Sequence, residues 1–213
     1  MEKVSAVIPA FNEEKRIHNV LRVLKDVSLI NEIIVVNDGS TDHTHHIASE
    51  YTNKVISLEK NIGKAGAIIR GIEASNGDII ILLDADLIGL TSEHVLDLLF
   101  PVLKDEVDTT IGIFTSGRFF TDWAQKIAPF LSGQRVIKKE LAADIYSLEI
   151  TEYGFEVAIT RLIMRKKLRI KKVILNNMSH VMKEEKLGLI KGLISRARMY
   201  WQIIRTFSLE ARR

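Results

Sequence analysis

Two carboxylates, Asp84 and Asp86, follow directly on the aliphatic run Ile79–Leu83. An uninterrupted aliphatic run after Asn76-Gly77-Asp78 is typical of a strand buried on both faces of a parallel sheet, and such strands present binding groups at their carboxyl ends. Like charges at the rim of an apolar sheet are costly unless a cation neutralises them. Carboxylates in this D-x-D spacing suit Mg²⁺ or Mn²⁺, although a solvated acidic pair would have the same spacing.

Polar and glycine residues recur where other predicted strands end or helices begin. They lie in the segments Pro9–Glu14, Asp38–Thr41 and Asn61–Gly66. Because the carboxyl ends of parallel strands share one edge of a sheet, these segments should converge with Asp84 and Asp86 on one crevice. There Asp38 could accept from the imide or ribose of a nucleotide, and Lys64 at a glycine-flanked helix start could bind phosphate. Each feature alone is also compatible with an ordinary turn or a solvated side chain.

The elements that would position these groups alternate between strand and helix. Apolar runs predict the strands, and apolar residues at helical spacing predict the helices. The expected strands are 4–8, 32–36, 55–58 and 79–83, and the expected helices are 13–25, 43–51, a helix ending near 75, and 92–103. Alternating units of this kind imply a parallel, doubly wound α/β sheet with right-handed crossovers.

The second half of the chain has a less regular pattern. It predicts strands at 110–114 and 173–175, a loop-to-strand segment at 132–139, and a helix at 153–166. A final helical segment carries apolar residues on one face and basic residues elsewhere. We find no internal repeat and no linker rich in proline or glycine, which favours one domain.

Composition narrows the classes of protein to consider. The chain has 213 residues and no cysteine, which excludes a disulfide scaffold and thiolate metal sites. The N-terminal residues lack the pattern of a secretory signal, and no apolar stretch reaches the roughly 18 residues that span a bilayer. We therefore expect a soluble, cytoplasmic protein.

Charge is distributed unevenly along the chain. The net charge is +3, yet residues 160–213 contain 15 of the 30 Lys and Arg and only three of the 27 Asp and Glu. This balance favours an anionic partner. No nucleic-acid-reading motif accompanies the charge, so nucleic acid is not expected. A terminal helix with Trp201 and Phe207 on its apolar face would pack on its own domain or lie at the inner face of an anionic membrane.

Four motifs in order resemble the family 2 glycosyltransferases of the GT-A fold. They are Val7–Glu14, Val36–Asp42, Asn61-x-Gly63-Lys64 and Leu83–Asp86. The resemblance implies a Rossmann-like, mostly parallel central sheet flanked by helices, here with a basic amphipathic helix at the C-terminus. It also implies binding of a nucleotide-sugar, usually a UDP-sugar. The residues implied in that binding are Pro9, Ala10, Phe11, Asn12, Glu14, Asp38, Gly63, Lys64, Asp84 and Ala85, with Asp84 and Asp86 holding Mg²⁺ or Mn²⁺ on the diphosphate.

The C-terminal half is similar to a narrower group, the glucosyl-3-phosphoglycerate synthases and small bacterial glycosyltransferases related to them. Ser132–Arg135 matches an acceptor-side loop, Tyr153–Glu156 an acidic helix start, and His180 a histidine that completes the metal shell. The candidates for catalytic roles are Asp86, Glu156 and Arg135. Arg135, Lys138 and Lys139 would anchor an acceptor phosphate or belong to a charged surface loop. An inverting reaction would need Glu156 or Glu152 to accept the acceptor's proton, and a retaining one could do without such a carboxylate. The Q-x-x-R-W motif of processive synthases is absent.

We therefore expect one domain, 1–213, with a nucleotide-sugar-binding half at 1–110, an acceptor-side half at 111–186 and a basic helical tail at 187–213. The expected activity is metal-dependent, non-processive transfer of one sugar to a phosphorylated small molecule or a membrane lipid. Two alternatives stay open. A sugar-phosphate nucleotidyltransferase would carry a loop rich in glycine and arginine where this chain has Pro9–Asn12, and a non-catalytic protein would bind nucleotide-sugar without turnover. The sugar, the stereochemistry and the formation of a homodimer are left open.

Overall fold

The computed structural model of the chain describes residues 2–114, 132–146 and 154–180. Backbone contacts group the chain into two units, Met1–Ser179 and His180–Arg213. The first unit contains nearly all of the described residues, and His180 alone of the second unit is among them.

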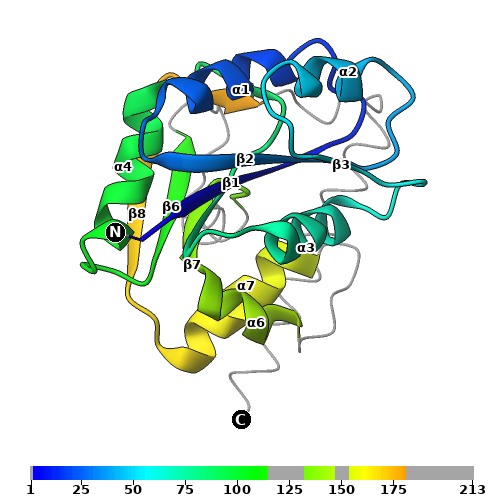
Figure 1. Ribbon diagram of the computed structural model, residues 1–213. Helices are drawn as coiled ribbons and strands as arrows, with labels where there is room; N and C mark the ends of the chain where they lie inside the picture. Colours follow the sequence, from blue (N-terminus) through cyan, green and yellow to red (C-terminus); the bar gives the residue numbers. More distant parts are fainter. Residues whose placement is uncertain (1, 115–131, 147–153, 181–213) are drawn as a thin grey trace, which may run out of the picture. The chain divides into compact units, whose positions relative to one another are not determined.

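Seven strands of the described residues form one sheet in the order β3-β2-β1-β4-β7-β6-β8 (Figure 1). Their bounds are β1 Val4–Ala10, β2 Ile30–Asn37, β3 Val55–Ser57, β4 Ile79–Leu82, β6 Thr109–Phe114, β7 Arg135–Lys138 and β8 Ile170–Leu175. Strands β1 to β4 pair in parallel, as do β6 and β8. Strand β7 pairs antiparallel with both β4 and β6. The parallel strands therefore end along one edge, as the sequence predicted.

Helices cover both faces of this sheet (Figure 1). One face carries α1 Ile17–Asp26, α2 Thr44–Ser49 and α4 Ser92–Leu103, and the other carries α3 Lys64–Ala74, α6 Lys139–Tyr146 and α7 Gly154–Lys166. Because side chains alternate along a strand, β1 directs Ala6 and Ile8 into the first core and Val7 into the second. The predicted fold class, a mostly parallel sheet flanked by helices, is confirmed. The predicted C-terminal helix lies outside the described residues.

A second, two-stranded sheet pairs β5 Leu87–Ile88 with β9 Ser179–His180. Strand β5 begins immediately after Asp86, so the residues that follow the predicted metal ligands are held by this pairing. No helix in the described part of the chain has both the length and the apolar character needed to cross a membrane.

Several element boundaries differ from the sequence prediction. Helix α1 begins at Ile17 and not at residue 13. Residues 14–16 form a turn in which the N–H groups of Arg16 and Ile17 both donate to the Glu13 carbonyl, and the N–H groups of Glu13 and Glu14 donate to Thr44 Oγ1 and Asp42 Oδ2. Strand β8 begins at Ile170, three residues earlier than expected, since it pairs with β6 from its first residue. The segment 132–139 contains a complete strand, β7.

Candidate active site

The loops after β1 and β2 are joined by hydrogen bonds at the edge where the parallel strands end. Asn12, at a φ of 55°, donates from its backbone to Ser40 Oγ at 3.0 Å, and its Oδ1 accepts from the Thr41 backbone at 2.9 Å. The Glu14 carboxylate accepts from the backbone of His43 at 3.1 Å. These contacts fix the loop before any ligand binds, and they leave the Phe11 side chain 45% exposed.

Asp38 connects the end of β2 to the start of α3. Its side chain is nearly buried, and its two carboxylate oxygens accept from the backbone N–H groups of Ile62 at 2.8 Å and Gly63 at 3.0 Å. Its own N–H donates to the Ala10 carbonyl at 2.8 Å. Asp38 therefore holds three loops together, a role that the sequence prediction of a base or ribose contact did not include.

Lys64, the first residue of α3, lies between two carboxylates. Its Nζ is 2.7 Å from Asp84 Oδ1 and 3.1 Å from Glu156 Oε1. Desolvation of the ammonium would lower the pKa of Lys64, but the charges of Asp84 and then Glu156 outweigh it and raise the pKa above its ordinary value. The lysine is therefore a permanent cation between the end of β4 and the first turn of α7.

The turn 132–134 packs directly against this ion pair. Gln134 donates from Nε2 to Asp84 Oδ2 at 2.9 Å. A Cβ atom on Gly133 would lie 2.5 Å from Lys64 Nζ and 2.9 Å from each Asp84 oxygen. Sequence reasoning assigned no role to Gln134, although it lies within the quoted Ser132–Arg135 motif. No local signal in the sequence indicates this contact, because it joins residues 50 positions apart.

Arg135 is fully buried in β7. It donates from Nε at 3.2 Å and from a terminal nitrogen at 3.0 Å to the Ser132 carbonyl. Burial lowers the pKa of Arg135 to about 10, an effect that the charge of Glu156 opposes. The guanidinium therefore braces the turn from inside the protein, and this geometry differs from that of an exposed anchor for an acceptor phosphate.

The structure brings together several of the residues that the sequence singled out. Lys64, Asp84 and Glu156 are in direct contact, and Asp38 and Gly63 join them through the start of α3. Ala85 is buried and Asp86 is half-buried, immediately before β5. His180 belongs to β9, which pairs with β5, but its side chain lies outside what the structure describes.

The donor set at the end of β4 fits a divalent cation. Asp84 and Asp86 supply carboxylate oxygens, which Mg²⁺ and Mn²⁺ prefer, and Mg²⁺ sites commonly combine one or two carboxylates with substrate phosphates. In residues 2–114, 132–146 and 154–180, no group of three or more His, Cys, Asp or Glu side chains is arranged to hold a metal ion alone. These described residues therefore need donor atoms from elsewhere to complete a coordination shell.

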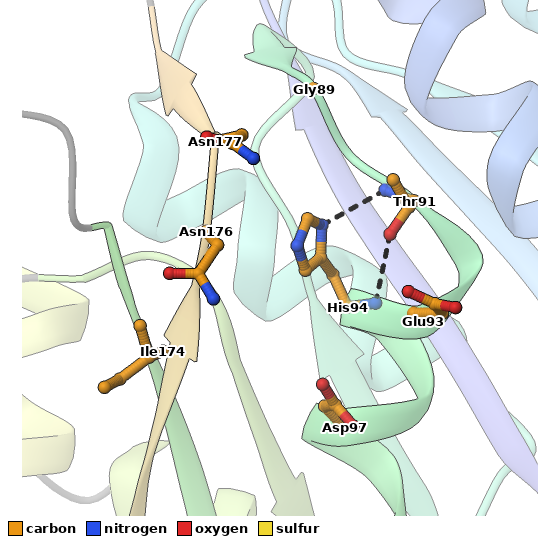
Figure 2. A pocket seen from close by; sticks show the side chains of 8 residues that line it. All are labelled: Gly89, Thr91, Glu93, His94, Asp97, Ile174, Asn176 and Asn177. Carbon is orange, nitrogen blue, oxygen red and sulfur yellow. Dashed lines mark hydrogen bonds between the residues drawn. The ribbon is translucent and has the colours of Figure 1, made fainter.

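A separate hollow of about 310 Å³ lies between the start of α4 and the end of β8 (Figure 2). The backbone N–H of Thr91 donates to His94 Nδ1, and the His94 N–H donates to Thr91 Oγ1, both at 3.3 Å. His94 Nδ1 and the Thr91 hydroxyl are thus engaged in capping α4. None of the predicted site residues lines this hollow.

Comparison with known proteins gives a consistent set of relatives. Residues 5–168 match the family model described as Glycosyl transferase family 2. The dolichyl-phosphate beta-glucosyltransferase of Homo sapiens is 31% identical over 175 residues, which cover 74% of this chain and 49% of the human protein. The glucosyl-3-phosphoglycerate synthase of Mycolicibacterium smegmatis is 38% identical over 121 residues, 52% of this chain and 40% of that protein.

Solved structures extend the similarity over nearly the whole chain. The glucosyl-3-phosphoglycerate synthase of Mycobacterium tuberculosis in complex with Mn²⁺, uridine diphosphate and glucosyl-3-phosphoglycerate has a TM-score of 0.77 and 27% identity, covering 97% of this chain and 78% of that one. The same enzyme in complex with Mg²⁺ and uridine diphosphate has a TM-score of 0.75. The alignment with the human dolichyl-phosphate beta-glucosyltransferase covers 49% of that protein, so this chain matches about half of its length.

Proposed function

The chain belongs to glycosyl transferase family 2, and on that basis we propose that it moves one sugar from a UDP-sugar to a phosphorylated acceptor in a metal-dependent, non-processive reaction. The acceptor is a phosphorylated small molecule or a membrane lipid phosphate. The observation that carries the proposal is the cluster of Asp84, Lys64 and Glu156 at the edge where the parallel strands end. The relatives named above support both acceptor classes by their names.

The donor would bind over the loops that Asp38 holds together. Phe11 offers an exposed aromatic ring to a base. The backbone of Pro9 and Ala10 lies beside it at the end of β1, and Asn12 follows it in the loop. Asp38 acts by holding Gly63 at the start of α3, and Glu14 by holding the start of α2. The positive end of α3 and the Lys64 ammonium together favour a diphosphate at this edge.

Cleavage of the bond between the anomeric carbon and the diphosphate builds negative charge on the leaving oxygen. Asp84, Asp86 and His180 would hold a Mg²⁺ or Mn²⁺ ion, with Ala85 between the two aspartates. The ion would supply Lewis-acid stabilisation of this charge. Lys64 contributes a fixed positive charge close by, in an arrangement that needs no reorganisation during the reaction. His180 enters this set from the sequence resemblance.

The acceptor would approach from the side of α7. Glu156 is 18% exposed and lies beside Lys64, where it can accept the acceptor's hydroxyl proton in an inverting reaction or contact the sugar in a retaining one. Arg135, buried behind it, supports the turn that faces Asp84. Contact of residues 187–213 with an anionic membrane, and a homodimer, remain predictions from the sequence.

The test begins with a screen of UDP- and GDP-sugars for thermal stabilisation with and without Mn²⁺, because a ligand that binds the folded state raises the melting temperature. Transfer from the stabilising donor is then assayed with 3-phosphoglycerate and with dolichyl phosphate in detergent. We expect Asp86→Asn to abolish transfer with either acceptor, whereas Asp97→Asn, an exposed aspartate on α4, retains it. Donor binding without transfer or hydrolysis would contradict the proposed activity.

A further inference from the structure

The Gln134 side chain makes a contact that the roles proposed above do not use. Its Nε2 donates to Oδ2 of Asp84 at 2.9 Å, while Lys64 Nζ lies 2.7 Å from Oδ1. Each Asp84 oxygen therefore has its own partner, one a neutral amide and the other an ammonium. Gln134 is 1% exposed, so the amide contact is shielded from bulk water.

The Gln134 amide is itself held in one orientation. Ser132 Oγ donates to Gln134 Oε1 at 3.0 Å, and the Gln134 backbone N–H donates to Ser132 Oγ at 3.3 Å. With the amide oxygen satisfied by the serine, the NH₂ group faces Asp84. The Gly112 N–H donates to the Gln134 carbonyl at 2.8 Å, which fastens the turn to β6.

The turn also fits closely against the ion pair. The Cβ atom that Gly133 lacks would fall within 3 Å of Lys64 Nζ and of both Asp84 oxygens. The backbone of the turn therefore confines the Lys64 ammonium and the Asp84 carboxylate from one side. Gln134 contacts Asp84 Oδ2, and Lys64 contacts Oδ1.

We propose that Gln134 is a positioning residue for the donor site. It fixes the rotation of the Asp84 carboxylate, so that Lys64 neutralises one oxygen and the carboxylate stays oriented to hold a divalent cation together with Asp86. Without the amide, the carboxylate can rotate about its Cβ–Cγ bond and Lys64 can engage both oxygens, so that a cation must displace the ammonium to bind. The inference rests on the proposed function, since it concerns the same site.

The consequence is specific to the metal-dependent part of donor binding. Asp84 is shared between Lys64 and the cation, so loss of the Gln134 amide should weaken the cooperation between Mn²⁺ and UDP. It should leave the metal-free affinity for UDP nearly unchanged. A purely structural role would instead lower the stability of the fold and both affinities together.

The experiment compares full-length wild-type protein with Gln134→Met, which keeps the length of the side chain and removes its hydrogen bonds. Calorimetry measures the Kd of UDP without metal and with saturating Mn²⁺. The metal-free Kd divided by the Kd with Mn²⁺ reports how strongly the metal promotes UDP binding. We expect Gln134→Met to reduce this ratio by about tenfold or more, the usual effect of losing a group that orients a metal ligand. Metal-free UDP affinity should stay within about twofold and the melting temperature of the unliganded protein should be preserved.

Two serine variants complete the experiment. Ser132→Ala removes the hydroxyl that orients the amide and should reduce the ratio in the same direction by a smaller factor. Ser49→Ala removes a hydroxyl that bonds only a helix carbonyl on the surface and should leave the ratio unchanged. If Gln134→Met does not fold, Ser132→Ala decides: a lower ratio supports the inference and an unchanged ratio overturns it.

The outcomes separate this inference from the proposed function. Wild-type protein that binds no UDP with Mn²⁺ overturns the proposed function and the inference with it. Wild-type cooperation that persists in Gln134→Met overturns the inference alone. Equal losses of metal-free and metal-dependent affinity also overturn it, because they would assign Gln134 to folding and not to the orientation of Asp84.

Discussion

Lys64 and Glu156 face each other from the first turns of two helices, with Nζ of the lysine 3.1 Å from Oε1 of the glutamate. A lysine at the positive end of a helix is electrostatically unfavourable, and the first turn of α3 contains no acidic residue of its own. Asp84, which follows β4, and Glu156, in the first turn of α7, offset this unfavourable charge. The contact therefore joins the donor half of the site to the acceptor half. The Lys64 ammonium that makes it is also the group proposed to bind the diphosphate.

Replacing Lys64 with methionine tests that charge. The variant leaves Asp84 and Glu156 without their shared ammonium, so their mutual repulsion and the lost positive charge should both oppose binding of the diphosphate. We expect kcat/KM for the donor to fall by about 100-fold, in line with the loss of one charge-stabilising group. Lys60→Met changes an exposed lysine four residues earlier and should stay near wild-type activity. Activity of Lys64→Met comparable to that of Lys60→Met would contradict this role.

The first half of the fold was predictable because its signals are local. Runs of mostly aliphatic residues predicted β1, β2 and β4, and helix α4 occupies the predicted residues 92–103. Parallel topology then placed Asp38, Lys64 and Asp84 at one edge without knowledge of any contact. The predicted start of α1 was wrong: residues 14–16 form a turn, which hydrogen bonds from Glu13 and Glu14 attach to Thr44 and Asp42, and periodicity does not report such contacts.

The acceptor side was less predictable because its contacts are long-range. Strand β7 has only four residues, one of them the buried Arg135, and lacks the aliphatic run that identifies a central strand. The hydrogen bond from Gln134 to Asp84 joins residues 50 positions apart. Neither spacing nor composition could indicate that this amide lies against the acidic motif, since that depends on the insertion of β7 beside β4.

Two glycines in the site should differ in their tolerance of alanine. Both have positive φ, 71° at Gly39 and 88° at Gly63. A Cβ at Gly63 meets no atom within 4 Å, whereas one at Gly39 would lie 2.8 Å from the backbone of Lys60 and Asn61. Gly63, with φ 88° and ψ 157°, has a backbone conformation that is almost restricted to glycine, so we expect Gly63→Ala to cost about 1–3 kcal/mol from strain alone. Gly39→Ala should cost about 1–3 kcal/mol more than Gly63→Ala, because the steric clash adds to the strain. Urea denaturation measures both, and equal losses would contradict the steric argument.

Asp38→Asn should loosen the loop that precedes α3. The carboxylate accepts from two backbone N–H groups, and an amide can accept only one of these bonds while its NH₂ group faces the other donor. We expect a loss of about 1–3 kcal/mol in the local stability of this loop. Hydrogen exchange at the Ile62 and Gly63 amides measures it directly. Asp26→Asn, an exposed change at the end of α1, is the matched control, and unchanged exchange in Asp38→Asn would refute the anchoring role.

Glu32 gives the chain a pH-dependent contribution to stability at the edge opposite the site. Partial burial would raise its pKa, but hydrogen bonds from Lys54, Ser5 and Asn76 outweigh this and hold the pKa at about 2, against an ordinary value of 4.5. A carboxyl group whose pKa is lower in the folded state stabilises the protein fully above its unfolded pKa. That contribution is lost as the pH falls from about 4.5 to about 2.

Glu32→Gln should therefore be destabilised relative to wild type by about 1–3 kcal/mol at pH 6, and the difference should shrink as the pH falls below about 4.5. Urea unfolding at a series of pH values gives the difference directly, because contributions of the other carboxylates are common to both proteins. Glu59→Gln changes an exposed carboxyl group and should show little difference at any pH. A Glu32→Gln difference that stays constant between pH 6 and the acid limit would mean that the hydrogen bonds, and not the ionised state of the carboxylate, account for its effect.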